Sequence, residues 1–229
     1  SNDAINYLPK SSISYQEATN WCDLRSSIES ETLSGDSNIN EPFLNGFRLP
    51  NESEWYVAAA IHYDVENNII DNIFDYTVEV GEGTITCAFG NILNCNNDTP
   101  LPVGFYNGIN MLDYNSVIES QAFRQPATVM HKYGTHNAHS PYGCYDMSGN
   151  VWEWCSDWFH DTNSQRRSAN MPSNQSSNQQ KRRVLRGGSW NDTQDSGLRV
   201  AIRLSGNPSI HQNFFTLGSI GFRCASDVE

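Results

Sequence analysis

The chain has 229 residues, enough to bury one sizeable core, and no Pro-rich or Gly-rich linker divides it, so we expect a single domain over residues 1–229. Its formal net charge of −12 repels phosphate backbones and anionic lipid headgroups. The composition therefore argues against binding to nucleic acid or to membrane surfaces, and a neutral or basic partner fits better.

The cysteines indicate an oxidising compartment. The six cysteines include no CxxC pair, which argues against a zinc knuckle and leaves disulfides or free thiols. Cys87 and Cys95 bracket the loop CAFGNILNC, whose turn-forming residues can bring its ends within bridging distance. No apolar run approaches the roughly twenty residues of a membrane span. We expect an extracytoplasmic protein, secreted or held at the cell surface through a segment absent from this chain.

Two capping boxes predict two helices. Ser14 followed by Glu17 precedes residues that fall on one face of a helix, so we expect a helix over about residues 14–26. Asn51 and Glu54 form the second capping box, and a helix follows it.

Strands and long loops make up the rest of the expected fold. Residues 69–133 hold short β-branched stretches broken by Asn, Gly and Pro, which indicate small strands among loops. Residues 164–180 have almost no apolar side chain and indicate a surface loop. Three further strands are expected at 184–188, 198–204 and 220–225. The sequence thus predicts a loop-rich α+β domain.

Four motifs give the chain a family resemblance: GFRLPNESEWYVAAA, YGCYDMSGNVWEWCSDWF, RVLRGGSW and GFRCA. In this order they resemble the formylglycine-generating-enzyme-like, or sulfatase-modifying factor, domains over about residues 13–225, although the stretch 69–101 departs from the pattern. The resemblance implies a C-type-lectin-like fold, with two helices on small twisted antiparallel sheets and long loops. It also implies a bridge between Cys22 and Cys224, a pair joined in some members.

The resemblance further implies a calcium ion near the turn MSGN. Its ligands would be side-chain oxygens of Asp146 and Glu153 and the carbonyl oxygens of Gly149 and Val151, a hard donor set that suits calcium. The alternative is a turn pinned by Asp146, with Glu153 in an ordinary ion pair. No cofactor is required in either case.

The enzymes of this family use two cysteines that follow the GGS motif and bind copper as thiolates. In this chain the matching positions fall near Asp192 and Gly197, and no cysteine occurs between Cys155 and Cys224. The resemblance therefore predicts a protein that does not run this oxidation. The alternative is a formylglycine-generating-type or other metal-dependent oxidase with a repurposed site.

The C-terminal motifs are also similar to those of variable proteins of diversity-generating retroelements. RVLRGGSW at 183–190, RxAxR at 199–203 and GFR at 221–223 follow the order of those proteins. That resemblance implies a fixed scaffold that displays a variable ligand-binding segment, here at about 184–225. Plain scaffold members share the pattern and stay an alternative.

Residues 199–204 alternate arginine or alanine with aliphatic side chains, so a strand there sends the two sets to opposite faces. Either the aliphatic set is core, or the arginines Arg199 and Arg203 are struts within the scaffold and Ile202 and Leu204 face a ligand. The resemblance favours the struts.

The residues that the scaffold motifs leave over form the predicted recognition face. They mix aromatic, aliphatic and hydrogen-bonding groups, which suits partner contacts. Phe214 and Phe215 are natural contact anchors, although either ring alone could be tucked under its loop. The predicted face comprises Trp190, Asn191, Asp192, Thr193, Ile202, Leu204, Ser205, His211, Asn213, Phe214, Phe215 and Thr216.

Together these patterns predict a monomeric, non-catalytic binding protein. Its partner would be a protein or another surface ligand, bound by the C-terminal segment, with no nucleic acid and no transmembrane segment involved.

Overall fold

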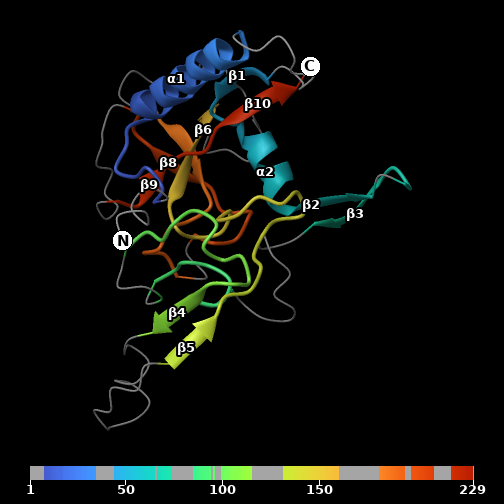
Figure 1. Ribbon diagram of the computed structural model, residues 1–229, viewed down its shortest axis with the longest axis vertical. Helices are drawn as coiled ribbons and strands as arrows, with labels where there is room; N and C mark the ends of the chain where they lie inside the picture. The colour runs from blue at the N-terminus through green and yellow to red at the C-terminus, as the bar shows by residue number, and fades with distance from the viewer. Residues whose placement is uncertain are drawn as a thin grey trace. The chain divides into compact units, whose positions relative to one another are not determined.

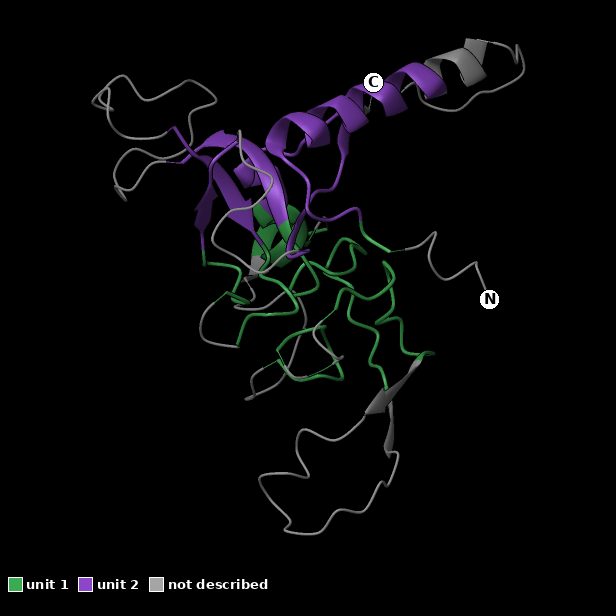
Figure 2. Cartoon of the chain, turned by 90° about the vertical axis from the view of Figure 1, so that its left-hand side faces the viewer, with its two compact units in different colours: residues 1–9, 56–152, 187–202 green, residues 10–55, 153–186, 203–229 purple. Residues whose placement is uncertain are grey.

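The computed structural model of the protein divides into two compact units, which Figure 2 colours separately. Unit 1 comprises residues 1–9, 56–152 and 187–202, and unit 2 comprises residues 10–55, 153–186 and 203–229. The structure describes residues 8–34, 44–64, 66–73, 85–93, 95, 99–114, 131–159, 181–193, 197–208 and 218–228. Each unit is assembled from three separate stretches of chain, so no single cut in the sequence separates them. The prediction of one domain over the whole chain stays a prediction.

Unit 2 begins with helix α1 (Tyr15–Ser34), for which the predicted capping box is confirmed (Figure 1). The Ser14 backbone N–H and hydroxyl both donate to Glu17 Oε2, at 2.9 and 2.8 Å, and the Glu17 N–H donates back to Ser14 Oγ at 3.2 Å. The helix runs eight residues past its expected end at Ser26, because no Gly or Pro interrupts the sequence before Gly35.

Helix α2 (Glu52–Ala60) starts at the second predicted capping box. The Asn51 backbone N–H donates to Glu54 Oε2 at 2.7 Å, and the Glu54 N–H donates to Asn51 Oδ1 at 2.9 Å. Immediately before α2, strand β1 (Leu44–Arg48) pairs antiparallel with β10 (Ala225–Val228), so the first and the last strand of unit 2 form one ladder (Figure 1).

The largest sheet has four strands in the order β8-β7-β6-β9. They are β6 (Trp152–Trp158), β7 (Arg183–Arg186), β8 (Leu204–Gly206) and β9 (Ile220–Gly221). The β6–β7 and β7–β8 pairs are antiparallel. Residues 153–155 of β6 are buried on both faces of the strand, which is the pattern of a strand inside a core.

Two predicted strands differ from the structure. Residues 198–203 form a turn, in which the Ile202 N–H donates to Arg199 O at 2.9 Å, and the strand begins only at Leu204. The stretch 220–225 is divided between the two-residue β9 and the start of β10. A strand therefore does not alternate the side chains of residues 199–203 between two faces.

Unit 1 contains two small hairpins and much irregular chain. Strands β2 (Ile61–Asp64) and β3 (Ile69–Ile73) pair antiparallel, as do β4 (Met111–Tyr114) and β5 (His131–Gly134) (Figure 1). The Asn150 side chain joins loops in this unit: its Oδ1 accepts from the Leu101 N–H at 2.9 Å and its Nδ2 donates to Leu101 O at 3.1 Å. A side-chain amide thus satisfies backbone N–H and C=O groups that, in a sheet, would be satisfied by a neighbouring strand.

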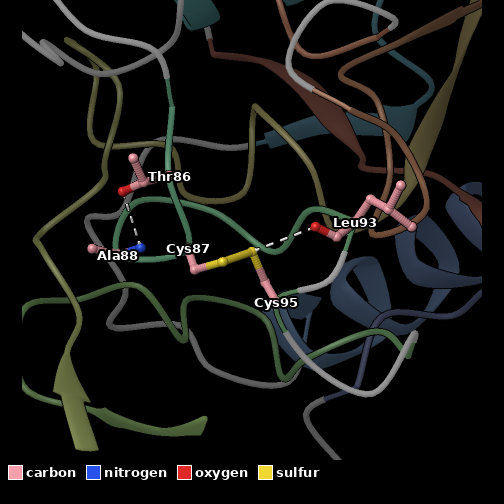
Figure 3. Close-up of a disulfide and its surroundings, with 5 residues drawn as sticks. All are labelled: Thr86, Cys87, Ala88, Leu93 and Cys95. Carbon is pink, nitrogen blue, oxygen red and sulfur yellow. Dashed lines mark hydrogen bonds between the residues drawn. A yellow bond between two sulfur atoms is a disulfide. The ribbon is translucent and has the colours of Figure 1, made fainter. Parts of the chain in front are cut away.

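The predicted disulfide between Cys87 and Cys95 is present in unit 1 (Figure 3). The bridged cysteines are 8 positions apart in the sequence, and Cys95 lies in a buried cluster with Ile85, Ile92 and Leu198. It therefore ties a surface loop to the core of the unit.

The α+β class predicted from the sequence is confirmed. Two helices, small antiparallel pairs and long irregular stretches are the features that the family resemblance implies for this fold. Among the described residues, no helix combines the length and the apolar character that crossing a membrane needs.

Candidate functional site

The turn after the GGS motif is organised around the Asp192 carboxylate in unit 1. Asp192 Oδ2 accepts hydrogen bonds from Trp152 Nε1 at 2.8 Å, from the Ser189 N–H at 2.9 Å and from the Ser189 hydroxyl at 2.5 Å. The backbone carbonyl of Asp192 also accepts from the Leu93 N–H at 3.1 Å. This residue therefore fixes the turn through both its side chain and its backbone.

Gly197 lies directly against Asp192 and Trp152. A Cβ placed on Gly197 would come within 2.9 Å of Trp152 Cζ2 and 3.1 Å of Asp192 Cγ. The two positions that match the family's cysteine pair are therefore neighbours in space. One of them, Gly197, has only a hydrogen atom in place of a side chain.

These residues do not fit a thiolate-bound copper ion. Glycine offers no side-chain ligand, and the Asp192 oxygen that faces the turn already receives three donors. A carboxylate is also a hard ligand, whereas Cu(I) selects soft sulfur. At this place the chain has a hydrogen-bonded turn where the oxidation would need two thiols.

The predicted recognition residues that follow the turn differ in exposure. Asn191 and Thr193 are exposed, whereas Asp192 is half-buried. The prediction that Trp190 belongs to a contact surface is wrong for this structure, because the residue is only 4% exposed. Its backbone N–H donates to Asn150 O at 3.0 Å, and burial of so large a ring stabilises the fold of unit 1.

The remaining predicted recognition residues are divided between the units. Ile202 is half-buried in unit 1, and Leu204 and Ser205 are half-buried in unit 2. The others lie outside the described residues: His211, Asn213, Phe214, Phe215 and Thr216. The face as a whole therefore stays a prediction.

The structure confirms one of the predicted arginine struts, Arg203. Arg203 Nη2 donates to Glu52 Oε2 at 2.9 Å, and Arg203 Nε also donates to Glu52 Oε1. For Arg199 the expected packing into the scaffold is wrong, because this residue is exposed and the turn at 199–202 directs Val200 into the core of unit 1 instead.

Glu52 is a buried acidic residue that the sequence analysis missed. Besides Arg203, it has Arg186 Nε at 3.8 Å from its Oε1, and the Arg186 guanidinium carbon lies 4.9 Å above the Trp55 ring. The Glu52 backbone N–H donates to Asp157 Oδ2 at 2.6 Å. The sequence did contain a sign of this pairing. Glu52 is a second acidic residue in the first turn of α2, next to the capping residue Asn51, and the two later motifs supply Arg186 and Arg203.

Glu153 forms a second buried network in unit 2. Its carboxylate is 4% exposed and accepts from Trp55 Nε1 at 2.7 Å. Arg223 Nε and Nη2 donate to its two oxygens, each at 2.6 Å, which is a bidentate pair. The arginine of the GFR motif is therefore a strut, as Arg203 is.

Asp146, the other predicted calcium ligand, lies in unit 1 at a backbone φ of 58°. Its Oδ2 accepts from the Gly104 N–H at 2.7 Å, so it pins two loops together. The bonds of Glu153 and Asp146 correspond to the alternative expected from the sequence, a pinned turn with an ion pair. Calcium binding at Asp146, Gly149, Val151 and Glu153 stays a prediction.

Cys22 of α1 and Cys224 stand next to each other in unit 2. Their sulfurs are 3.1 Å apart across 202 residues of sequence, farther than the roughly 2.05 Å of a bond, so both are thiols here. The pKa of Cys224 is lowered to about 7, chiefly by the hydrogen bond with Cys22 and to a smaller extent by nearby Arg25, against the effect of burial. The expected partners are in place, and the bridge itself stays a prediction.

Comparison with known proteins decides the family. The family described as the sulfatase-modifying factor enzyme 1-like domain matches residues 2–228. The chain belongs to this family. The resemblance read from the four sequence motifs is thereby confirmed.

This sulfatase-modifying-factor-like chain has curated relatives of several kinds. It is 40% identical over 89 residues to the serine/threonine-protein kinase pkn1 of Chlamydia pneumoniae, covering 39% of this chain and 13% of that protein. It is 39% identical over 90 residues to the formylglycine-generating enzyme of Streptomyces coelicolor, covering 38% of this chain and 26% of that protein. It is 39% identical over 89 residues to the inactive C-alpha-formylglycine-generating enzyme 2 of Bos taurus, covering 37% of this chain and 23% of that protein. Each match spans about a quarter or less of the relative's length.

Two solved structures are similar over 95% of this sulfatase-modifying-factor-like chain. Treponema denticola variable protein 1 is 21% identical, with a TM-score of 0.48 and 70% of that chain covered. CarF is 16% identical, with a TM-score of 0.43 and 66% covered.

Proposed function

We propose that this chain is a non-catalytic binding protein of the sulfatase-modifying factor enzyme 1-like family. The carrying observation is the Asp192 turn. The carboxylate at a position matching a copper cysteine is occupied by Trp152 and Ser189, and the matching Gly197 has no side chain. A site that has exchanged its reactive groups for a hydrogen-bonded turn supports display of a surface and does not support thiol oxidation.

The binding surface that we propose follows this turn. Asn191 and Thr193 are exposed beside the fixed Asp192 in unit 1, and within unit 2 arginine struts pair with buried carboxylates. Because the struts belong to the motifs, exposed side chains between them, such as Asn191 and Thr193, can change with little effect on the scaffold. This arrangement supports the variable segment at about 184–225 that we infer for a diversity-generating retroelement.

A direct test is the sequence of this gene in many sibling isolates. Changes confined to residues 190–217, with Arg186, Arg203 and Arg223 unchanged, are the expected result. Changes scattered evenly over the chain would contradict the variable-segment proposal.

A second test addresses recognition. The chain is applied to an array of cell-surface proteins and glycans, and the strongest ligand is titrated against variants. We expect Phe214→Ser with Phe215→Ser to weaken binding by about 2 kcal/mol or more, with little change in thermal midpoint. Tyr142→Ser, an exposed position in unit 1, is the control and should bind normally. If the double variant unfolds, the two rings are core and the face lies elsewhere.

The oxidase alternative has its own measurement. The purified chain is assayed for bound copper and iron and for oxygen consumption with a cysteine-containing peptide. We expect neither stoichiometric metal nor oxygen uptake. Both together would overturn the non-catalytic proposal.

We further propose an extracytoplasmic location, because the Cys87–Cys95 disulfide persists in oxidising compartments. A protein or another surface ligand is the partner class that this location and the acidic surface support.

A further inference from the structure

Helix α1 carries a second apolar stripe that unit 2 does not cover. The helix buries Ala18 and Cys22 completely, whereas Trp21, Leu24 and Ile28 are 48%, 49% and 54% exposed. At roughly 100° per residue, the three exposed side chains fall within about 60° of each other, on a flank roughly a quarter turn from the buried face. Single exposed apolar residues are common, but three at helical spacing form a continuous surface.

This stripe begins at a hollow on the helix surface. Glu17, Asn20, Trp21 and Leu24 line a hollow of about 240 Å³. The exposed indole of Trp21 lies between the aliphatic Leu24 and the Glu17 carboxylate. The hollow therefore offers an apolar wall with an acidic group at its N-terminal end, a combination that suits an apolar side chain next to a cationic one.

The charge around the stripe is acidic. Glu17 is exposed at the N-terminal end of the stripe, on the same flank of the helix. The basic residue here, Arg25, has its guanidinium carbon 4.4 Å over the Phe47 ring, so its side chain is directed at its own unit. The whole chain carries a net charge of −12, and Glu29 and Glu31 follow Ile28 in the sequence.

These charges distinguish the occupants. A second copy laid antiparallel along the stripe would set Glu17 of one helix near the acidic end of the other, which repels. Anionic lipid is repelled for the same reason. A basic partner is attracted, and residues 21, 24 and 28 have the spacing by which one helix contacts another.

We propose that the stripe formed by Trp21, Leu24 and Ile28 is a docking site for a basic amphipathic helix of a partner protein. The partner's apolar side chains lie along the stripe and its lysine or arginine side chains lie near Glu17. This site is on a different element from the proposed recognition segment and is tested separately.

The probe is a fluorescent helical peptide with leucine at positions i, i+3, i+4 and i+7 and lysine at the flanking positions. Its matched control keeps every leucine and replaces each lysine by glutamate. Fluorescence anisotropy should show the lysine peptide binding at least about tenfold more tightly than the glutamate peptide, with the difference shrinking as salt rises.

Variants locate the binding. Leu24→Ser with Ile28→Ser should weaken binding of the lysine peptide about tenfold or more, at an unchanged thermal midpoint. Val57→Ser and Ile109→Ser, which are exposed apolar positions on other elements, should leave it unchanged. Should the double variant lower the midpoint, Leu24→Gln alone is used, since it keeps the side-chain length.

Three results would overturn the proposal. The first is equal binding of both peptides, and the second is normal binding by the stripe variants. The third is another occupant: a dimer in sedimentation that the double variant abolishes indicates a second copy, and stripe-dependent binding to neutral phosphatidylcholine vesicles indicates a membrane. Loss of the recognition-segment ligand through Phe214 and Phe215 changes none of these readouts, so the two proposals fail independently.

Discussion

Glu153 is held between an indole and a guanidinium, both contributed from elsewhere in the sequence. Trp55 donates to it from α2, and Arg223 pairs with both of its oxygens. Two charges removed from water stabilise each other only as a pair, so the loss of one leaves the other buried and uncompensated. The ion pair therefore determines what a substitution at this residue does.

The first prediction concerns the charge of Glu153. Glu153→Gln keeps the shape and removes the charge, which leaves the Arg223 guanidinium without its counter-charge. We expect the free energy of unfolding to fall by about 3–5 kcal/mol in urea titrations. Glu66→Gln, an exposed position in a turn, is the matched control and should change it by less than about 0.5 kcal/mol. Equal effects at the two positions would contradict a stabilising role for the pair.

Calcium is tested on the same variant. If the ion binds at Asp146 and Glu153, adding it after chelation should raise the thermal midpoint of the unmodified protein and not that of Glu153→Gln. An unchanged midpoint in the unmodified protein means that the turn is purely structural.

The second prediction concerns Cys22 and Cys224. Since the pKa of Cys224 is lowered to about 7, its thiolate fraction increases about tenfold between pH 6 and pH 8 and then levels off. With oxidised glutathione, Cys224 first forms a mixed disulfide and releases one glutathione, and Cys22 then displaces the second. The rate of bridge formation, followed by peptide mapping, should show this plateau.

An ordinary thiol would keep accelerating above pH 8, which would contradict the lowered pKa. Cys144→Ser serves as the control and should not change the profile. The closed bridge should raise stability by about 5 kcal/mol in the chain-entropy model, because its cysteines are 202 positions apart in the sequence.

At the scale of elements, the Asp192 turn combines tight packing against Gly197 with three hydrogen bonds to one carboxylate oxygen. The third prediction is that Gly197→Ala lowers the free energy of unfolding by about 1–3 kcal/mol, because the added methyl group meets Trp152 and Asp192 at 2.9 and 3.1 Å. Chemical denaturation measures the change. Ala201→Ser, in the exposed part of the next turn, should have little effect. A neutral Gly197→Ala would show that Trp152 moves aside without cost.

The elements show which structure the sequence could predict. Both capping boxes were found, because Ser14 with Glu17 and Asn51 with Glu54 bond within one turn and need no other part of the chain. The strand expected over 198–204 was wrong, since an alternating pattern does not reveal the turn that buries Val200 and exposes Arg199. Motifs whose hydrogen bonds close within one helical turn were therefore predicted correctly, whereas the strand, whose formation depends on packing against distant residues, was not.

At the candidate site the same division holds. The motifs located the Asp192 turn and the Arg203 and Arg223 struts, but burial decided which residues can meet a partner. Trp190 was expected on the surface and is core, and Glu52 was overlooked although it pairs with Arg203. A sequence names the charged groups, whereas their pairing joins residues that are far apart in the chain, 70 positions for Glu153 and Arg223 and 151 for Glu52 and Arg203.

At the scale of the whole molecule, the net charge of −12 opposes self-association. The fourth prediction is that the protein sediments as a monomer at micromolar concentration, in low and in moderate salt. If a dimer forms in moderate salt and dissociates in low salt, repulsion between the negative charges is the only force that keeps the monomers apart. A salt-independent dimer would contradict the prediction.

The struts also affect the order of events during synthesis. Glu52 and Glu153 leave the ribosome long before Arg203 and Arg223, the partners that neutralise them, and β10 follows to complete the ladder with β1. Until both arginines have emerged, two carboxylates destined for the interior must remain hydrated. Unit 2 therefore closes only once residues 203–228 are available, so a nascent chain halted before Arg203 would keep those carboxylates in water.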